Sequence, residues 1–88
     1  MHFTYILLLS NSKYYVGHSS NLIERIAYHK DGRVDATKPF RPVRLVYYSA
    51  FEDEALSIKF EKYLKTGSGF AFRNKHLICA KSQSRTDI

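Results

Sequence analysis

Two strand-like runs separated by a short polar turn constrain this chain more than any other feature. Residues 3–9 are apolar at nearly every position, and Tyr14, Tyr15 and Val16 favour strands. A near-continuous apolar run of this length is typical of a strand that is buried on both faces. The polar residues 10–12 lie between the two runs, so the sequence predicts a β-hairpin.

The segment after the hairpin carries the signals of a helix. Asn21 with Glu24 three positions later resembles a capping box, and Gly32 provides a C-terminal stop. Arg25 and His29 are four residues apart, so they stand together along one edge of the helix. The predicted apolar stripe of this helix consists of Leu22, Ile23, Ile26 and Ala27.

The second half of the chain alternates between loop, strand and helix patterns. Residues 32–42 form a polar, basic loop interrupted by two prolines, and residues 43–48, extending toward 51, form a third strand. Acidic residues 52–54 begin a second helix that ends at Gly67, and Ser68 caps a shorter helix over residues 70–78. The predicted core stripe of the second helix is Leu56, Phe60, Tyr63 and Leu64.

These elements fit one α+β domain over residues 1–80, followed by a flexible C-terminal tail over residues 81–88. A chain of 88 residues buries a small core, because a domain of this size removes only about 60% of its unfolded surface from water. The lone cysteine, Cys79, excludes an intramolecular disulfide, and the four histidines show no zinc-ligand spacing with it. The N-terminal apolar run is too short to span a bilayer and lacks a basic leader, so we expect a cytoplasmic protein without a membrane segment.

The charge balance points to a polyanionic partner. The chain has 14 Lys and Arg against 8 Asp and Glu, a formal net charge of +6. Nucleic acid is the first candidate for such a partner, and a membrane surface is the second. The plain alternative is that the charge only keeps the protein soluble.

The order of these motifs resembles the GIY-YIG nuclease superfamily, in particular small stand-alone domains related to the catalytic domain of excinuclease C. The first family motif corresponds to Phe3-Thr4-Tyr5, where only the tyrosine matches, and the second corresponds closely to Tyr15-Val16-Gly17. The family's helix arginine falls on Arg25, with His29 one turn later, and its metal-binding glutamate falls on Glu61. The resemblance covers residues 3–77 and includes Thr66-Gly67-Ser68-Gly69, with Phe72 after it.

The resemblance implies a GIY-YIG-like α/β sandwich, in which helices flank a small three-stranded antiparallel sheet. It also implies a metal-dependent endonuclease that hydrolyses DNA phosphodiester bonds with one Mg²⁺ or Mn²⁺ ion. A role in DNA repair or recombination would fit this chemistry. Branched and single-stranded DNA both remain open as substrates, and specificity could come from DNA shape, a protein partner or a homodimer.

Each candidate residue has a chemical role in that hydrolysis. Glu61 would hold the metal ion, and Arg25 would grip the non-bridging phosphate oxygens. Tyr5 would position or deprotonate the attacking water, with its pKa lowered by the nearby cation and Arg25. Tyr15 would hydrogen-bond the phosphate or the water, and His29 would assist proton transfer or contact phosphate. The residues expected to contact nucleic acid are Arg33, Lys38, Arg41, Lys65 and Arg73.

Each of these residues also has a structural alternative. The two tyrosines would serve as core aromatics, Arg25 and His29 as a solvated helix edge, and Glu61 as the ion-pair partner of Lys65. A non-catalytic nucleic-acid-binding module therefore remains the main alternative function, and a small interaction protein is the third.

The hairpin allows a geometric test of the catalytic hypothesis. Side chains alternate between the faces of a sheet, so pairing of Leu9 with Tyr14 would turn Tyr5 and Tyr15 to opposite faces. A shared site requires both hydroxyls on one side. The hypothesis therefore predicts an odd-length hairpin loop or a β-bulge between the two tyrosines.

Overall fold

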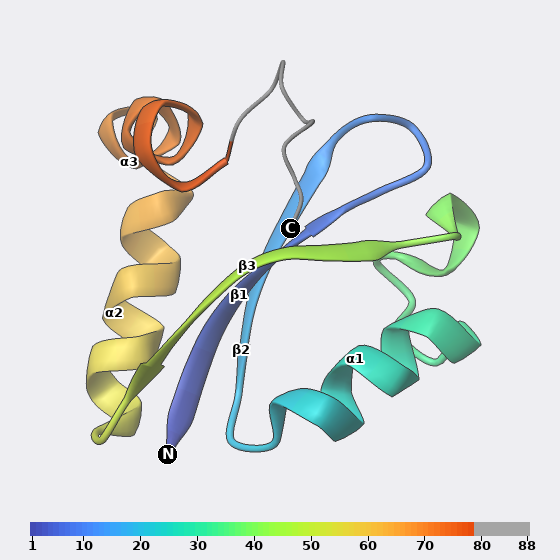
Figure 1. Cartoon of the computed structure of the whole chain (residues 1–88), viewed down its shortest axis with the longest axis horizontal. Helices are drawn as coiled ribbons and strands as arrows, with labels where there is room; N and C mark the ends of the chain where they lie inside the picture. Colours follow the sequence, from blue (N-terminus) through green and yellow to red (C-terminus); the bar gives the residue numbers. More distant parts are fainter. Residues whose placement is uncertain (79–88) are drawn as a thin grey trace.

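A computed structural model describes residues 1–78 of the chain, so Cys79 and the predicted tail 81–88 lie outside the described residues. Three antiparallel strands, β1 (His2–Leu8), β2 (Tyr14–Ser19) and β3 (Arg44–Phe51), form a sheet in the order β2-β1-β3. Helix α1 (Leu22–Asp31) lies on one side of the sheet and α2 (Glu54–Leu64) on the other, with α3 (Gly67–Phe72) at the end of α2 (Figure 1). The predicted α+β fold is confirmed.

The central strand β1 supplies more of the core than any other element. Thr4, Tyr5, Ile6 and Leu7 are each 0% exposed, as expected for a strand covered on both faces. On the α1 side, Tyr5 and Leu7 pack with Leu9, Ile26 and Val43, whereas on the α2 side Ile6 packs with Val16 and Leu64. The two faces of one strand therefore anchor two separate apolar clusters.

The hairpin register places both tyrosines on the same face. Leu8 pairs with Tyr14, so the connecting loop consists of the five residues 9–13. Tyr15 then lies opposite Leu7, and Tyr5 lies opposite Gly17. The predicted odd-length loop is confirmed, and it aligns the tyrosines without a bulge in this hairpin. The sheet's register shift occurs instead between β1 and β3, at Ile6 and Leu7.

Helix α1 begins and ends where the sequence predicts. The side chain of Asn21 accepts a hydrogen bond from the backbone N–H of Glu24, and Gly32 adopts a left-handed conformation at φ 79°. The predicted apolar stripe is wrong, because Ile23 is 85% exposed and Ala27 is also exposed. The buried line of the helix passes instead through Leu22, Ile26 and His29, which follow one another at spacings of four and three.

The buried face of α2 also differs from the predicted one. Ser57 and Leu64 are the fully buried residues of α2, whereas the predicted core residues Leu56 and Tyr63 are 50% and 41% exposed. Close packing against β1 explains the buried serine, since the Thr4 hydroxyl donates to the Ser57 carbonyl at 2.7 Å.

The boundaries of the last helices also differ from the prediction. Helix α2 ends at Leu64, before Gly67, and Thr66 rather than Ser68 caps α3 through its hydroxyl. A π-helical turn, Arg73–Leu77, follows α3, so residues 70–78 do not form one helix. The predicted loop after α1 contains a short 3₁₀ helix, Lys38–Phe40. None of the helices within residues 1–78 has the length and apolar character needed to cross a membrane.

Candidate active site

A buried chain of hydrogen bonds lies between β1 and α1. The Tyr5 hydroxyl is 2.7 Å from Nε2 of His29, and Nδ1 of the same imidazole is 2.8 Å from the hydroxyl of Thr37. All three residues are 0% exposed. The Thr37 hydroxyl donates to the Val34 carbonyl at 3.5 Å, which leaves its oxygen to accept a hydrogen bond from Nδ1 of His29. That tautomer leaves Nε2 free to accept the proton of Tyr5.

Gly17 of β2 makes room for the hydroxyl of Tyr5. A Cβ atom at position 17 would lie 2.6 Å from the Tyr5 hydroxyl oxygen and 2.7 Å from its ring carbon Cζ. Any larger residue would therefore displace the ring from His29. The glycine of Tyr15-Val16-Gly17 is required by this close approach.

Burial raises the pKa of Tyr5 and lowers the pKa of His29. Desolvation raises the pKa of Tyr5 to about 12, although Arg25 acts to lower it. Arg25 thus lowers this pKa as predicted, but burial outweighs it and the net shift is upward. The predicted effect of a metal cation stays a prediction. Burial and then the charge of Arg25 lower the pKa of His29 to about 4, so the imidazole is neutral at pH 7.

Tyr15 and Arg25 complete the group on the α1 side. The Tyr15 ring lies edge-on to His29 with 5.2 Å between ring centroids, and 6.5 Å from the Tyr5 ring. The nearby Tyr5 hydroxyl raises the pKa of Arg25 against the opposing effect of burial. Four of the five predicted catalytic residues thus come together on one face of the sheet.

The fifth residue, Glu61, belongs to an ionic cluster on the α2 side. One carboxylate oxygen is 2.5 Å from Nδ1 of His18, and the other is 2.9 Å from Nζ of Lys65. The Glu61 side chain is 14% exposed, so burial alone would raise its pKa. Lys65 and His18 outweigh that effect and lower the pKa below its ordinary value, which keeps the carboxylate ionised.

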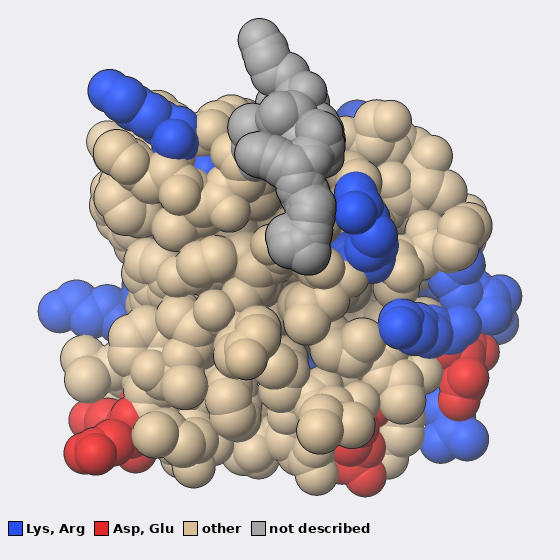
Figure 2. Space-filling model, viewed as in Figure 1, with Lys and Arg blue, Asp and Glu red and all other residues tan. Residues whose placement is uncertain are grey.

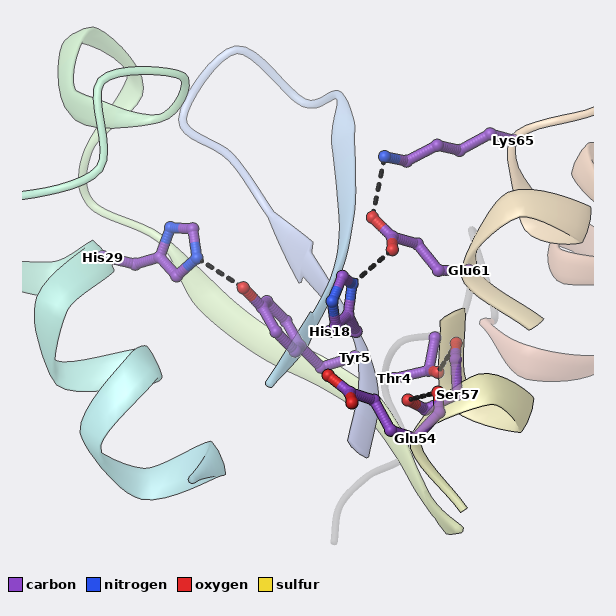
Figure 3. Close-up of polar contacts among 8 residues, drawn as sticks. All are labelled: Thr4, Tyr5, His18, His29, Glu54, Ser57, Glu61 and Lys65. Carbon is purple, nitrogen blue, oxygen red and sulfur yellow. Dashed lines mark hydrogen bonds and ion pairs between the residues drawn. The ribbon is translucent and has the colours of Figure 1, made fainter. Parts of the chain in front are cut away.

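The two clusters meet across the edge strand β2. Figure 3 shows Tyr5 and His29 on the α1 side and the Glu61 cluster beside them on the α2 side. The charges of Arg25 and Glu61 both act on the pKa of Tyr5, lowering and raising it respectively. Arg25 on the α1 side and Glu61 on the α2 side therefore both influence one hydroxyl, and the influence of Glu61 is the smaller.

Comparison with known proteins agrees with this arrangement. Residues 1–75 match the family model described as the GIY-YIG catalytic domain. The chain belongs to the GIY-YIG catalytic domain family. A UPF0213 protein of Listeria monocytogenes (strain F2365) is 37% identical over 65 residues, which cover 73% of each chain. The UPF0213 protein YazA of Bacillus subtilis is 31% identical over 65 residues, covering 73% of this chain and 66% of YazA. No solved structure gives a significant match.

The predicted nucleic-acid contacts of this GIY-YIG domain differ in exposure. Arg33, Lys38 and Arg41 are exposed in and beside the loop after α1, and basic side chains project over that part of the surface in Figure 2. Lys65 is also exposed, although its ammonium pairs with Glu61. Arg73 is only 4% exposed and its guanidinium lies over the Phe70 ring, so its contact with nucleic acid stays a prediction.

Two residues of the candidate site, His18 and Thr37, are not among the predicted catalytic or binding residues. His18 lies at the surface, where it pairs with Glu61 from the face of β2 opposite Tyr15. Strand alternation supplies a signal for His18, because it follows the close-packed Gly17 directly. Thr37 has no signal of its own, since its contact with His29 depends on how the loop folds back onto α1.

Glu61 provides a fit for one hard divalent cation. Within residues 1–78, no three His, Cys, Asp or Glu side chains come together as a metal-ligand cluster. An ionised, partly exposed carboxylate is nevertheless sufficient for Mg²⁺, which keeps several of its waters and binds through one or two carboxylates. His18 Nδ1 lies beside that carboxylate and Lys65 holds its other oxygen, so both would have to adjust when a cation binds.

Proposed function

We propose that this GIY-YIG domain is a divalent-metal-dependent endonuclease that hydrolyses DNA phosphodiester bonds. The observation that carries the proposal is the hydroxyl of Tyr5, which is hydrogen-bonded to a neutral imidazole and lies within the electrostatic range of both Arg25 and Glu61. Membership of the GIY-YIG family supports the same chemistry.

The buried chain explains how a phenol with a raised pKa can act as a base. Tyr5 does not ionise at rest, because its pKa is about 12. As its oxygen takes a proton from the attacking water, its own proton passes to Nε2 of His29. Thr37 holds Nδ1 of the ring and so keeps Nε2 directed at Tyr5. The hydroxide forms a bond to phosphorus while the bond from phosphorus to the leaving oxygen breaks.

The remaining residues bind the phosphate and balance its charge. Arg25 would hold the non-bridging oxygens through its fork of donors, and Tyr15 would hydrogen-bond the phosphate or the water. Glu61 would hold Mg²⁺ or Mn²⁺, which when bound supplies positive charge to the phosphoryl group and the leaving oxygen. The exposed residues Arg33, Lys38 and Arg41 would contact the DNA backbone on either side.

A cleavage assay tests the proposal. Branched, flapped, single-stranded and duplex DNA are incubated with the protein in Mg²⁺ or Mn²⁺, with EDTA as the metal-free control. We expect Glu61→Ala to lower the cleavage rate by about 10³-fold or more, because it removes the metal's protein ligand. Glu54→Ala is the matched control, since Glu54 is exposed and begins the same helix. Cleavage that survives Glu61→Ala would contradict the proposal.

A non-catalytic DNA-binding module is the second candidate function. It is favoured by one observation, namely that both oxygens of Glu61 already have cationic or hydrogen-bonding partners. Salt-sensitive binding without cleavage in any metal would support this alternative. If cleavage occurs, its dependence on branches or flaps tests the finer proposal of structure-selective action in DNA repair or recombination. The stoichiometry of the active species then separates a monomer from a homodimer.

A further inference from the structure

A groove beside the candidate active site is not used by the proposed chemistry. Its first part is a hollow of about 300 Å³ that begins at Tyr15 and Lys65 and reaches Tyr14, Phe70 and Arg73. The same last three residues line an adjoining hollow of about 590 Å³, which extends to Lys13 and Asn74. The groove therefore starts at two residues of the site and runs along β2 toward the hairpin loop.

Phe70 provides a flat aromatic surface within this groove. The residue is 50% exposed, although the guanidinium of Arg73 lies 3.9 Å from its ring centroid. Arg73 is also 4.9 Å from the Tyr14 ring, so it holds the two aromatic rings from within the protein. Arg73 thus supports the Phe70 ring on one side, while half of the residue's surface stays exposed to solvent.

The charges around the groove suit a polyanion. Exposed Lys65 stands at the end nearest the candidate active site, and exposed Lys13 stands at the far end. Neither hollow has an aspartate or glutamate among its lining residues within the described part of the chain. Aromatic platforms flanked by basic side chains are the usual means of binding single-stranded nucleic acid, because every base has a π face that can stack.

We propose that this groove binds an unpaired nucleotide of the DNA strand next to the scissile phosphate, with its base stacked on Phe70. A base within a duplex is already stacked on its neighbours, so its face is not available to the ring. This inference rests on the proposed function, because continuity with Tyr15 and Lys65 places the occupant next to the phosphate. It makes flapped or single-stranded DNA the preferred substrate class.

A binding experiment in EDTA tests the groove without requiring hydrolysis. Fluorescence anisotropy would compare a labelled oligothymidine with a duplex of equal length. We expect Phe70→Leu, which keeps an apolar side chain but lacks the aromatic face, to weaken single-strand binding about 5- to 150-fold. Duplex affinity should change little, and Phe70→Tyr should restore single-strand binding.

The matched control is Phe72→Leu, since Phe72 is also exposed but packs against Tyr63 and His76 outside the groove. An equal loss with Phe72→Leu, an equal loss on duplex DNA, or no loss with Phe70→Leu would overturn the inference. Failure of wild-type protein to bind the single strand would also overturn it. Thermal unfolding by circular dichroism checks that each variant is folded.

A base analogue keeps the test decisive if Phe70→Leu does not fold. Wild-type protein would be mixed with oligonucleotides that carry 2-aminopurine, whose fluorescence falls when it stacks on an aromatic ring. Quenching at one position of the single strand is expected, and unchanged fluorescence at every position would overturn the inference.

Cleavage assays separate failure of the inference from failure of the proposed function. If single-strand binding depends on Phe70 but no DNA is cleaved in any metal, the proposed endonuclease activity is refuted and nucleotide binding in the groove is supported. If flapped and duplex DNA are cleaved equally and Phe70→Leu has no effect, nucleotide binding in the groove is refuted and the endonuclease activity is supported.

Discussion

The two polar clusters of the site lie on opposite faces of the sheet and differ in their exposure to water. Tyr5, His29 and Thr37 are 0% exposed and are joined by hydrogen bonds between neutral groups. Glu61 lies in an ionic cluster in which the side chains of His18 and Lys65 are 37% and 54% exposed. One cluster is buried and consists of neutral groups, and the other is charged and partly exposed.

This contrast indicates a different role for each cluster. A buried polar group that loses its partner costs about 1–3 kcal/mol, so the Tyr5 chain has little freedom to rearrange. An exposed ion pair contributes about 0–1 kcal/mol, so Lys65 and His18 can release Glu61 at little cost. The α1 side therefore suits a fixed proton pathway, and the α2 side suits a site that exchanges protein partners for a cation. Four predictions test this division.

Tyr5→Phe should have the largest effect on activity. It removes the proposed base and leaves Nε2 of buried His29 without a partner. We expect the cleavage rate on the preferred DNA to fall by about 10²- to 10⁴-fold, with a loss of about 1–3 kcal/mol in the free energy of unfolding. Single-turnover kinetics and chemical denaturation measure the two effects. Full activity in Tyr5→Phe would mean that the buried chain is purely structural.

Acid should destabilise the protein through His29. The folded-state pKa of this imidazole is about 4, against an ordinary value of 6.5. Between these values the unfolded chain binds a proton that the folded chain does not, so the free energy of unfolding falls as the pH is lowered. The loss amounts to up to about 3 kcal/mol by pH 4. Urea denaturation at several pH values should show a flatter profile for His29→Gln. Identical slopes would assign the acid sensitivity to other groups.

Thr37→Val should disrupt the proton pathway indirectly. The substitution keeps the shape of Thr37 but removes the oxygen that accepts from Nδ1 of His29, at a cost of about 1–3 kcal/mol in stability. The pH–rate profile should shift as well, because the imidazole loses the partner that fixes its tautomer. Thr37→Ser retains the hydroxyl and should restore both properties. If the valine and serine variants behave alike, the hydroxyl has no positioning role.

His18→Ala should have the smallest effect on folding. His18 and Glu61 form a pair at the surface, so we expect the free energy of unfolding to change by no more than about 1 kcal/mol. Thermal and urea denaturation measure this directly. A change comparable to that of Thr37→Val would show that the ionic cluster is as rigid as the buried one, and the contrast between them would fail.

Local signals made much of the fold predictable. The cap at Asn21 and the stop at Gly32 follow from chemistry within a few residues of each position. The odd-length hairpin follows instead from the requirement that Tyr5 and Tyr15 share one face. Burial was harder to predict, because it depends on which side of a helix meets the sheet. Ile23 and Leu56 are apolar but exposed, whereas Arg73 is charged but buried beneath two rings.

The contacts within the candidate site were hard to predict for the same reason, because they depend on how distant parts of the chain pack together. A family motif indicates Tyr5, Arg25 and Glu61, but it contains no information on the second partner of a side chain. The contacts of His18 with Glu61 and of Thr37 with His29 link residues 43 and 8 positions apart. The raised pKa of Tyr5 results from its burial in the packed core, and the neighbouring residues in the sequence do not indicate it.

The five-residue connection between β1 and β2 has a consequence for engineering and for natural variation in loop length. If the loop keeps its five residues, adding or removing one residue shifts the pairing register by one, which would turn Tyr15 toward α2 and His18 toward α1. A shift of two residues keeps each side chain on its face. Insertions that lengthen only the loop should therefore preserve activity, whereas insertions that shift the register by one should abolish it, a difference that a small library of loop variants would reveal.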